Sequence, residues 1–116
     1  MPTTREISGE IVFPANAISG TAPRVLIELH DVSMQDQASV VLATKVLRNV
    51  PVGLSTRVPF NLIAPNGAAG RSLSIRVQVD MQTDRSLMAG DFLSTVANPV
   101  PVFGDAVGVL AYVTKL

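Results

Sequence analysis

The stretch Leu73–Gln82, with the sequence LSIRVQVDMQ, decides the fold class of this chain. Leu, Ile, Val, Val and Met occupy its odd positions, and Ser, Arg, Gln, Asp and Gln occupy its even positions. Successive side chains of a strand point to opposite faces, so this alternation predicts one buried face and one solvated face. We therefore expect Leu73–Met81 to be a half-buried strand of an antiparallel sheet, with Ile75 and Val77 at the centre of the core.

Six other stretches alternate more weakly and are separated by turn-forming residues: Ile7–Phe13, Val25–Val32, Val40–Leu47, Thr56–Leu62, Leu87–Thr95 and Val107–Leu116. Pro59 has no N–H to donate, so Thr56–Leu62 is predicted to lie at a sheet edge or to bend. Val40–Asn49 has an alternative interpretation as an amphipathic helix, which its β-branched residues disfavour. Together the seven stretches predict an all-β fold, an antiparallel β-sandwich of about seven strands with Greek-key, immunoglobulin-like topology.

The inward faces of these strands follow from the same alternation. Beyond the stretch quoted above, the side chains predicted to face the core are Ile7, Gly9, Ile11, Phe13, Val25, Ile27, Leu29, Val58, Phe60 and Leu62.

Length and composition bound the remaining possibilities. The chain has 116 residues, of which 47% are apolar, and we expect one domain over residues 1–116 with residues 1–6 flexible. Its net charge is zero, which disfavours a nucleic-acid partner, and no polybasic segment is present for anionic lipid. There is no cysteine, so disulfides, thiolate zinc sites and a cysteine nucleophile are excluded.

No segment has the roughly 20 consecutive apolar residues that a membrane-spanning helix needs. The first residues, Met1–Ile7, also lack the apolar stretch of a signal peptide. We expect a cytoplasmic protein if the chain is complete, and a periplasmic one if it is a trimmed mature form.

His30 and Asp31 form the single adjacent histidine–carboxylate pair of the sequence. Neighbours in a strand point to opposite faces, so they cannot hydrogen-bond as the base and orienting residue of a catalytic triad. No Gly-x-Ser-x-Gly segment supplies a nucleophile either. We expect His30 on the outer face of its strand and Asp31 at the start of a turn, with no catalytic residue.

Asp80, Asp84 and Asp91 are candidate ligands for a hard cation, but their spacing matches no calcium loop. Solvated turn residues are the favoured interpretation, so we predict no metal and no cofactor.

The glycine-rich run Gly67–Ser72 resembles a phosphate loop only faintly, because it leads into a strand and not into a helix. Its cation, Arg71, would make an isolated phosphate contact. Arg57, Arg71 and Arg76 are dispersed and not interleaved with aromatic residues, so no stacking platform for single-stranded nucleic acid is predicted. Met34 lies in a polar stretch and is either an exposed anchor or folded over the core.

Several short motifs resemble the YbaY/YscW-like lipoprotein family. Leu26–Ser33 (LIELHDVS), Asp36 and Val40–Ala43 (VVLA) are similar to its V-x-L-x-D-V-S…D…A core. The resemblance extends to Ile7–Gly9, Val58–Leu62 (VPFNL) and Ser74–Val79, and covers roughly Ile7 to Val102.

This resemblance implies a small β-sandwich and supplies no catalytic residue. Family members from type III secretion systems act as pilotins, lipoproteins that escort and assemble outer-membrane secretin subunits. This sequence has no lipobox cysteine and no signal sequence, so the resemblance implies the fold and not membrane anchoring.

These observations predict a non-enzymatic domain that binds another protein or itself, with no nucleic acid and no membrane insertion. A sheet edge is the expected surface, because its unpaired N–H and C=O groups can be completed by a partner strand. The first or last strand, Ile7–Phe13 or Val107–Val113, is the expected edge, and a homodimer is its simplest use. The alternative is a small-ligand binder that uses the space between the sheets.

Overall fold

The computed structural model describes residues 4–17, 19–33, 39–54, 56–67, 69–81, 90–94 and 98–116. The regular elements in these residues are all β-strands. In chain order they are β1 (Thr4–Val12), β2 (Gly20–Asp31), β3 (Val40–Val52), β4 (Arg57–Pro65), β5 (Leu73–Asp80), β6 (Phe92–Leu93), β7 (Pro99–Val100), β8 (Ala106–Tyr112) and β9 (Thr114–Lys115). No helix in the described residues has the length and apolar character needed to cross a membrane.

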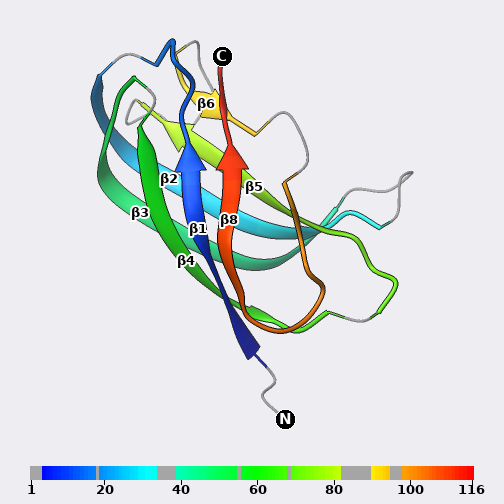
Figure 1. The fold of residues 1–116 in the computed structure, drawn as a ribbon. Helices are drawn as coiled ribbons and strands as arrows, with labels where there is room; N and C mark the ends of the chain where they lie inside the picture. Colours follow the sequence, from blue (N-terminus) through cyan, green and yellow to red (C-terminus); the bar gives the residue numbers. More distant parts are fainter. Residues whose placement is uncertain are drawn as a thin grey trace.

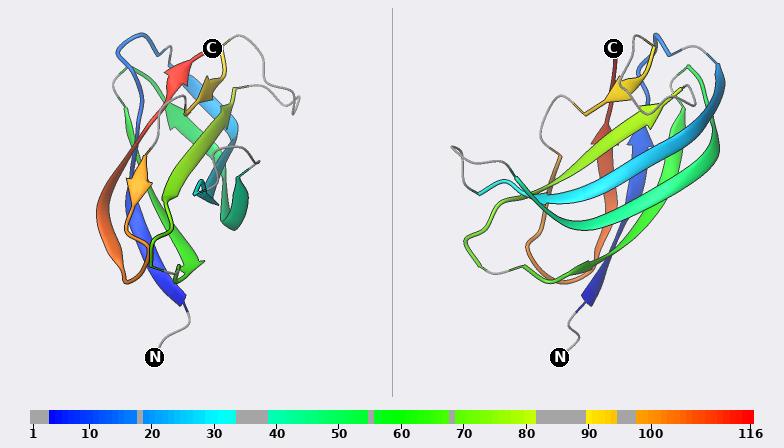
Figure 2. Two further views of the ribbon diagram at one scale, coloured as in Figure 1. Left: turned by 90° about the vertical axis from the view of Figure 1, so that its right-hand side faces the viewer. Right: turned by 180° about the vertical axis from the view of Figure 1, so that it is seen from behind.

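The strands form two sheets that pack face to face (Figures 1 and 2). The smaller sheet has the order β4-β1-β8, and the larger has the order β3-β2-β5-β6-β9, with β7 also paired to β5. The strands β2 and β3 are long and curve strongly around one side of the molecule (Figure 1). This architecture confirms the predicted all-β sandwich.

The core lies between the sheets, and its residues alternate along β1, β2, β4 and β5 as the sequence predicts. On β2, for example, Val25, Ile27 and Leu29 are fully buried. Near one end of the core the rings of Phe13 and Phe92 meet edge to face, with centroids 5.0 Å apart. Of the inward residues predicted above, Gly9 and Met81 are half-buried. The others are buried: Ile7, Ile11, Phe13, Val25, Ile27, Leu29, Val58, Phe60, Leu62, Leu73, Ile75, Val77 and Val79.

The pairing of β1 differs from the prediction. We expected the first strand at an edge, but β1 is the central strand of the smaller sheet, antiparallel to β4 and parallel to β8. The expected Thr56–Leu62 edge strand is confirmed, because β4 pairs with β1 on one side only. The last strand also lies at an edge, as β8, so one of the two predicted edges is correct.

The C-terminal third of the chain is more fragmented than the sequence predicts. The expected strand Leu87–Thr95 contains β6 among its described residues, whereas 87–89 and Thr95 lie outside them. The expected strand Val107–Leu116 divides into β8 and β9. The strand β7 was not predicted, because Pro99 reads as a turn residue. It pairs with β5 through Leu73 and Ser74.

The outward face of β5 is less solvated than the alternation predicts. Arg76 is exposed, but Ser74 and Asp80 are buried. Both polar groups are paired: Ser74 Oγ accepts from the Asn98 N–H at 2.9 Å, and an Asp80 oxygen lies 2.7 Å from Arg24 Nε. Hydrogen bonding allows a polar side chain to be buried, and periodicity alone does not reveal such partners.

The two long borders of the sandwich differ. At the border near β8, Asn98 bridges the sheets, because its side chain donates to the Ile75 carbonyl of β5 and accepts from the Tyr112 N–H of β8. At the opposite border, the edge strands β3 and β4 belong to different sheets and do not pair with each other. That border is therefore where the sandwich is open.

Candidate functional site

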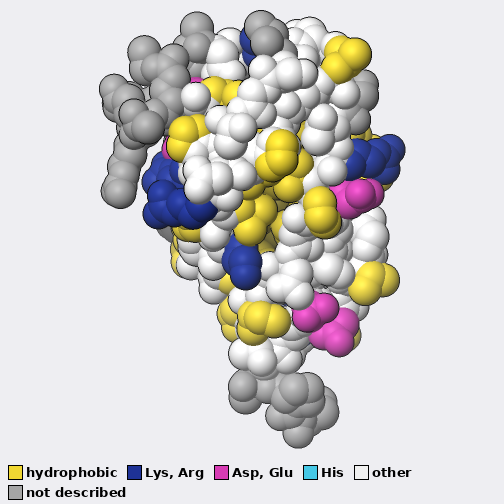
Figure 3. Space-filling view, turned by 90° about the vertical axis from the view of Figure 1, so that its left-hand side faces the viewer, with side chains coloured by type: hydrophobic (Ala, Val, Ile, Leu, Met, Phe, Trp, Pro, Cys, Tyr) yellow, Lys and Arg dark blue, Asp and Glu magenta, His cyan; other side chains and the backbone are white. Residues whose placement is uncertain are grey.

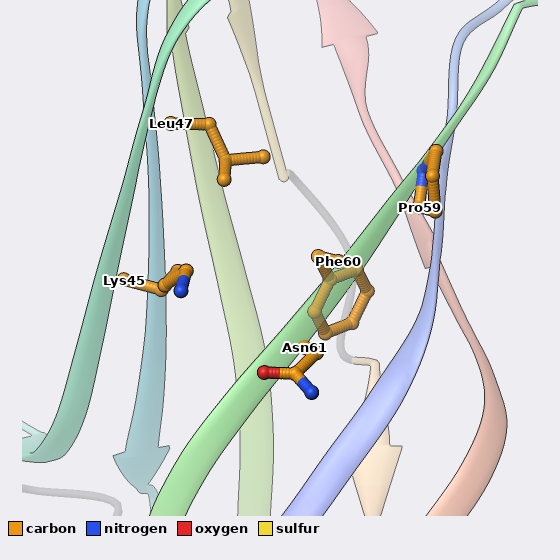
Figure 4. Close-up of a pocket in the computed structure, with 5 residues that line it drawn as sticks. All are labelled: Lys45, Leu47, Pro59, Phe60 and Asn61. Atoms are coloured by element: carbon orange, nitrogen blue, oxygen red, sulfur yellow. The ribbon is translucent and has the colours of Figure 1, made fainter.

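A groove runs between β3 and β4 at this open border (Figure 4). The two strands are joined by a tight connection in which the Thr56 N–H donates to the Gly53 carbonyl at 3.1 Å. Because β3 belongs to the larger sheet and β4 to the smaller one, the two strands diverge beyond this connection. The space between them has a volume of about 320 Å³. It is lined by Lys45 and Leu47 of β3 and by Pro59, Phe60 and Asn61 of β4.

The register of β3 explains why Lys45 reaches the groove. Leu47 lies opposite Val25 and Lys45 lies opposite Ile27, two residues of β2 whose side chains face the core. Lys45 therefore occupies an inward position where the alternation calls for an apolar residue, and its side chain is nevertheless exposed. An inward-pointing charge on an edge strand is one device by which proteins prevent uncontrolled pairing of edges.

On the β4 side, Phe60 forms an apolar floor and is 5% exposed. Asn61 and Pro59 flank it on the outer face of the strand, and Pro59 lies opposite Glu10 without an N–H to donate. Neither the Asn61 side chain nor the Lys45 side chain makes a hydrogen bond or ion pair with another described residue. The groove therefore offers an apolar surface, one cation and one amide to a binding partner.

The face that contains this groove is rich in apolar side chains. Hydrophobic side chains gather along its middle, and Lys and Arg side chains lie around them (Figure 3). The exposed apolar residues of β3 are Val40, Val41 and Val46, which are 59%, 45% and 39% exposed. Exposed apolar residues at a strand edge are typical of a surface that contacts another protein.

His30 and Asp31 do not form a catalytic pair. His30 is buried on the outer face of β2, where its Nδ1 lies 2.6 Å from Ser39 Oγ and its Nε2 lies 3.1 Å from Glu28 Oε1. Asp31 ends the strand and accepts from the backbone N–H and hydroxyl of Ser33. Both placements agree with the sequence prediction, except that His30 is buried and not solvated.

Arg71 is bound to Asp31 and is not free for a phosphate, since its Nε and Nη2 lie 2.8 and 2.7 Å from Asp31 Oδ2. The Ser33 hydroxyl, then the Ser33 N–H, and then Arg71 lower the pKa of Asp31 from 3.8 to about 2. Arg57 contacts Glu10 at 3.5 Å. Arg57 and Arg71 are thus each paired with a different carboxylate, and Arg76 is exposed on β5.

Asp80 and Asp91 are both buried and have partners. Asp80 is paired with Arg24 and accepts from Gln78 Nε2, and Asp91 accepts from the Met81 N–H at 2.8 Å. The third candidate ligand, Asp84, lies outside the described residues, as does Met34. Within the described part of the chain, no three His, Cys, Asp or Glu side chains are grouped so as to hold a metal ion.

Arg5 is a buried cation at the far end of β1. Its Nη1 donates to the carbonyls of Pro101 and Gly104, while Nε and Nη2 have no hydrogen-bond partner among the described residues. Burial lowers the pKa of this guanidinium, and the nearby charge of Asp105 opposes the shift. These contacts tie the segment before β8 to β1, which is a structural role.

The sequence analysis missed the groove, although it placed Pro59 at a sheet edge or bend and Phe60 toward the core. The available signal was Lys45 itself, a charge between Ala43 and Leu47 at positions that share one face. The sheet in which each edge lies depends on long-range pairing, which period-two alternation does not specify.

Comparison with known proteins gives one informative result. No protein-family model matches the chain, and no curated protein matches it. Among solved structures, the fold is similar to that of an alternative pilotin from the type II secretion system of Vibrio cholerae. The TM-score is 0.69 at 20% sequence identity, over 97% of this chain and 99% of that one. The two proteins therefore share a fold over essentially their whole lengths.

Proposed function

We propose that this chain is a non-enzymatic protein-interaction domain of the pilotin kind, which holds a segment of a partner protein in the β3–β4 groove. The groove itself is the observation that carries this proposal. It is formed by two edge strands, has an apolar floor at Phe60, and presents a cation and an amide that have no partner among the described residues.

The shape of the site favours a segment of a protein over an enclosed small molecule. Small-ligand sites usually have about 300–1,000 Å³ and surround most of the ligand with several converging polar groups. This groove is at the lower end of that range, is open along the molecular surface, and offers polar side chains only from Lys45 and Asn61 (Figures 3 and 4). An extended or helical segment can place one or two apolar side chains there and continue along β3.

The partner that we propose is an outer-membrane secretin subunit. The motifs quoted above resemble a family whose members bind such subunits, and the fold is similar to that of a pilotin. These two likenesses rest on different features, one on short sequence motifs and one on the backbone.

Calorimetric titration of the purified chain with the purified secretin subunit of the same organism tests this function. Asn61→Trp fills the groove and should weaken binding at least about tenfold. Ile63→Trp is the matched control, because Ile63 is the next outward residue of β4, is exposed, and does not line the groove. Binding that Asn61→Trp leaves unchanged, or no binding by the wild-type chain, would contradict the proposal.

Self-association through β8 is a second candidate, in line with the sequence prediction of a homodimer. The strand β8 is an edge of the smaller sheet and exposes Val107, at 82%, and Tyr112. Light scattering at micromolar concentration measures the mass. A dimer that Val107→Lys converts to a monomer supports this candidate, and a wild-type monomer rules it out.

A further inference from the structure

The free edge of β3 has a charge pattern that specifies the kind of strand it can accept. Over its 13 residues, VVLATKVLRNVPV, it contains two cations, Lys45 and Arg48, and no Asp or Glu. Neither cation forms an ion pair with a described residue. The chain as a whole has zero net charge, so this edge is a local concentration of positive charge.

The surroundings of Arg48 add an independent argument. Arg48 lies directly opposite Arg24 of β2, on the outer face of the sheet. Like charges directly opposite each other on neighbouring strands are destabilising. Asp80 neutralises Arg24 at 2.7 Å, while Arg48 keeps its charge toward solvent. A carboxylate placed beside Arg48 from outside would therefore neutralise a cation that has no ion-pair partner among the described residues.

The positions of the two cations fix the spacing of the complementary charges. Lys45 is on the inner face of β3 and Arg48 is on the outer face, three residues apart. Between them, Val46 faces outward and Leu47 faces the groove. A strand lying beside β3 would place one residue opposite each of these four positions, alternating between the faces.

We propose that β3 accepts a partner segment as an added strand, and that this segment carries the pattern acidic–apolar–apolar–acidic opposite Lys45, Val46, Leu47 and Arg48. This inference rests on the proposed function and deepens it, because it names the chemistry of the segment that binds beside the groove. The pattern reads the same in both directions, so it holds for parallel and antiparallel addition. Backbone hydrogen bonds to β3 supply affinity, and the two carboxylates supply selectivity.

The same pattern disfavours a second copy of this chain as the occupant. A second copy of β3 would bring two further cations, and no Asp or Glu, to the same edge. The sequence contains one segment with acids three apart and an apolar residue between them, Glu28–Asp31, and it is already paired within the sheet as part of β2.

Two synthetic peptides of about ten residues test this proposal on the intact chain. Both alternate Thr and Val around a four-residue centre, which is Asp-Val-Val-Glu in one peptide and Lys-Val-Val-Lys in its twin. The acidic peptide should bind at least about tenfold more tightly by fluorescence anisotropy, because two attractive pairs replace two repulsive ones. It should also slow amide hydrogen exchange in every second residue of β3, which a side-chain contact alone would not do.

Charge reversal at β3 supplies the decisive variant. In the double variant Lys45→Glu with Arg48→Glu the preference should invert, so that the Lys peptide becomes the tighter ligand. Lys115→Glu is the matched control, since Lys115 lies on β9 at the opposite border of the same sheet, and it should keep the wild-type preference. Circular dichroism of each variant verifies that the fold is kept.

Equal binding of the two peptides, a preference that does not invert, or unchanged exchange in β3 would overturn strand addition. These outcomes are distinguishable from failure of the proposed function. If the secretin subunit still binds the wild-type chain and Asn61→Trp still weakens this binding, the groove proposal stands and only the strand-addition proposal fails.

Discussion

Ile75 and Arg76 are neighbours in β5 with opposite surroundings. Ile75 is 1% exposed in the core between the sheets, and Arg76 is exposed on the outer face. We predict that Ile75→Ala lowers the free energy of unfolding by about 2–5 kcal/mol, from lost transfer energy and a residual cavity. Arg76→Ala should stay within about 0.5 kcal/mol of wild type. Urea denaturation measures both, and equal large losses would show that β5 is buried on both faces.

Asp31 makes the stability of the fold depend on pH. Hydrogen bonds from the Ser33 hydroxyl and N–H, with a further contribution from Arg71, lower the pKa of Asp31 from 3.8 to about 2. A carboxyl whose pKa is lowered by folding stabilises the folded state fully above its unfolded value, and this contribution is lost as the pH falls through the folded value.

The substitution Asp31→Asn removes this contribution. At neutral pH the variant should therefore unfold at a lower urea concentration than wild type, and the difference should shrink between the ordinary pKa of 3.8 and the folded pKa of about 2. Urea midpoints measured across this pH range provide the test. A difference that persists unchanged down to about pH 2 would mean that the loop contacts of Asp31 do not depend on its charge.

At the scale of elements, Gly9 controls the close approach of β1 and β8. A Cβ atom at this position would lie 1.8 Å from the Val109 carbonyl oxygen, and the register of the two strands is irregular between Ile7 and Gly9. We predict that Gly9→Ala forces β8 away and destabilises the protein by about 1–3 kcal/mol or more. Ser8→Ala, on the other face of β1, should have little effect. Thermal unfolding followed by circular dichroism distinguishes the two.

The alternation of the sequence predicts which face of a strand is buried, but it does not predict which strands pair with one another. The strands β1, β2, β4 and β5 alternate clearly because one face of each meets the other sheet, and most of their inward residues were predicted. Ala22 and Ala64 are also buried and were missed, because they lie outside the predicted strand bounds. The strand β7 was missed because its short pairing with β5 is set by Asn98, whose hydrogen bonds cross the sandwich. The central position of β1 was also missed, because its parallel pairing with β8 joins residues about a hundred positions apart.

At the scale of the whole molecule, the candidate site results from the unequal borders of the sandwich. One border is closed by β6, β7, β9 and the bridging side chain of Asn98, whereas the border between β3 and β4 stays open. The sequence shows that Pro59 belongs to an edge and that Lys45 interrupts an apolar face. It does not show that these two edges face each other, because this depends on how the chain crosses between the sheets.

The stability of the whole domain should not require a bound metal ion. Asp80 and Asp91, two of the three carboxylates considered as ligands, are buried and accept hydrogen bonds from Arg24, Gln78 and Met81. A ligand that binds only the folded state raises the melting temperature by mass action, so its removal lowers it. We predict that EDTA leaves the melting temperature unchanged in a thermal scan. A decrease of several degrees, restored by added calcium and abolished in Asp84→Asn, would establish a cation site that includes Asp84.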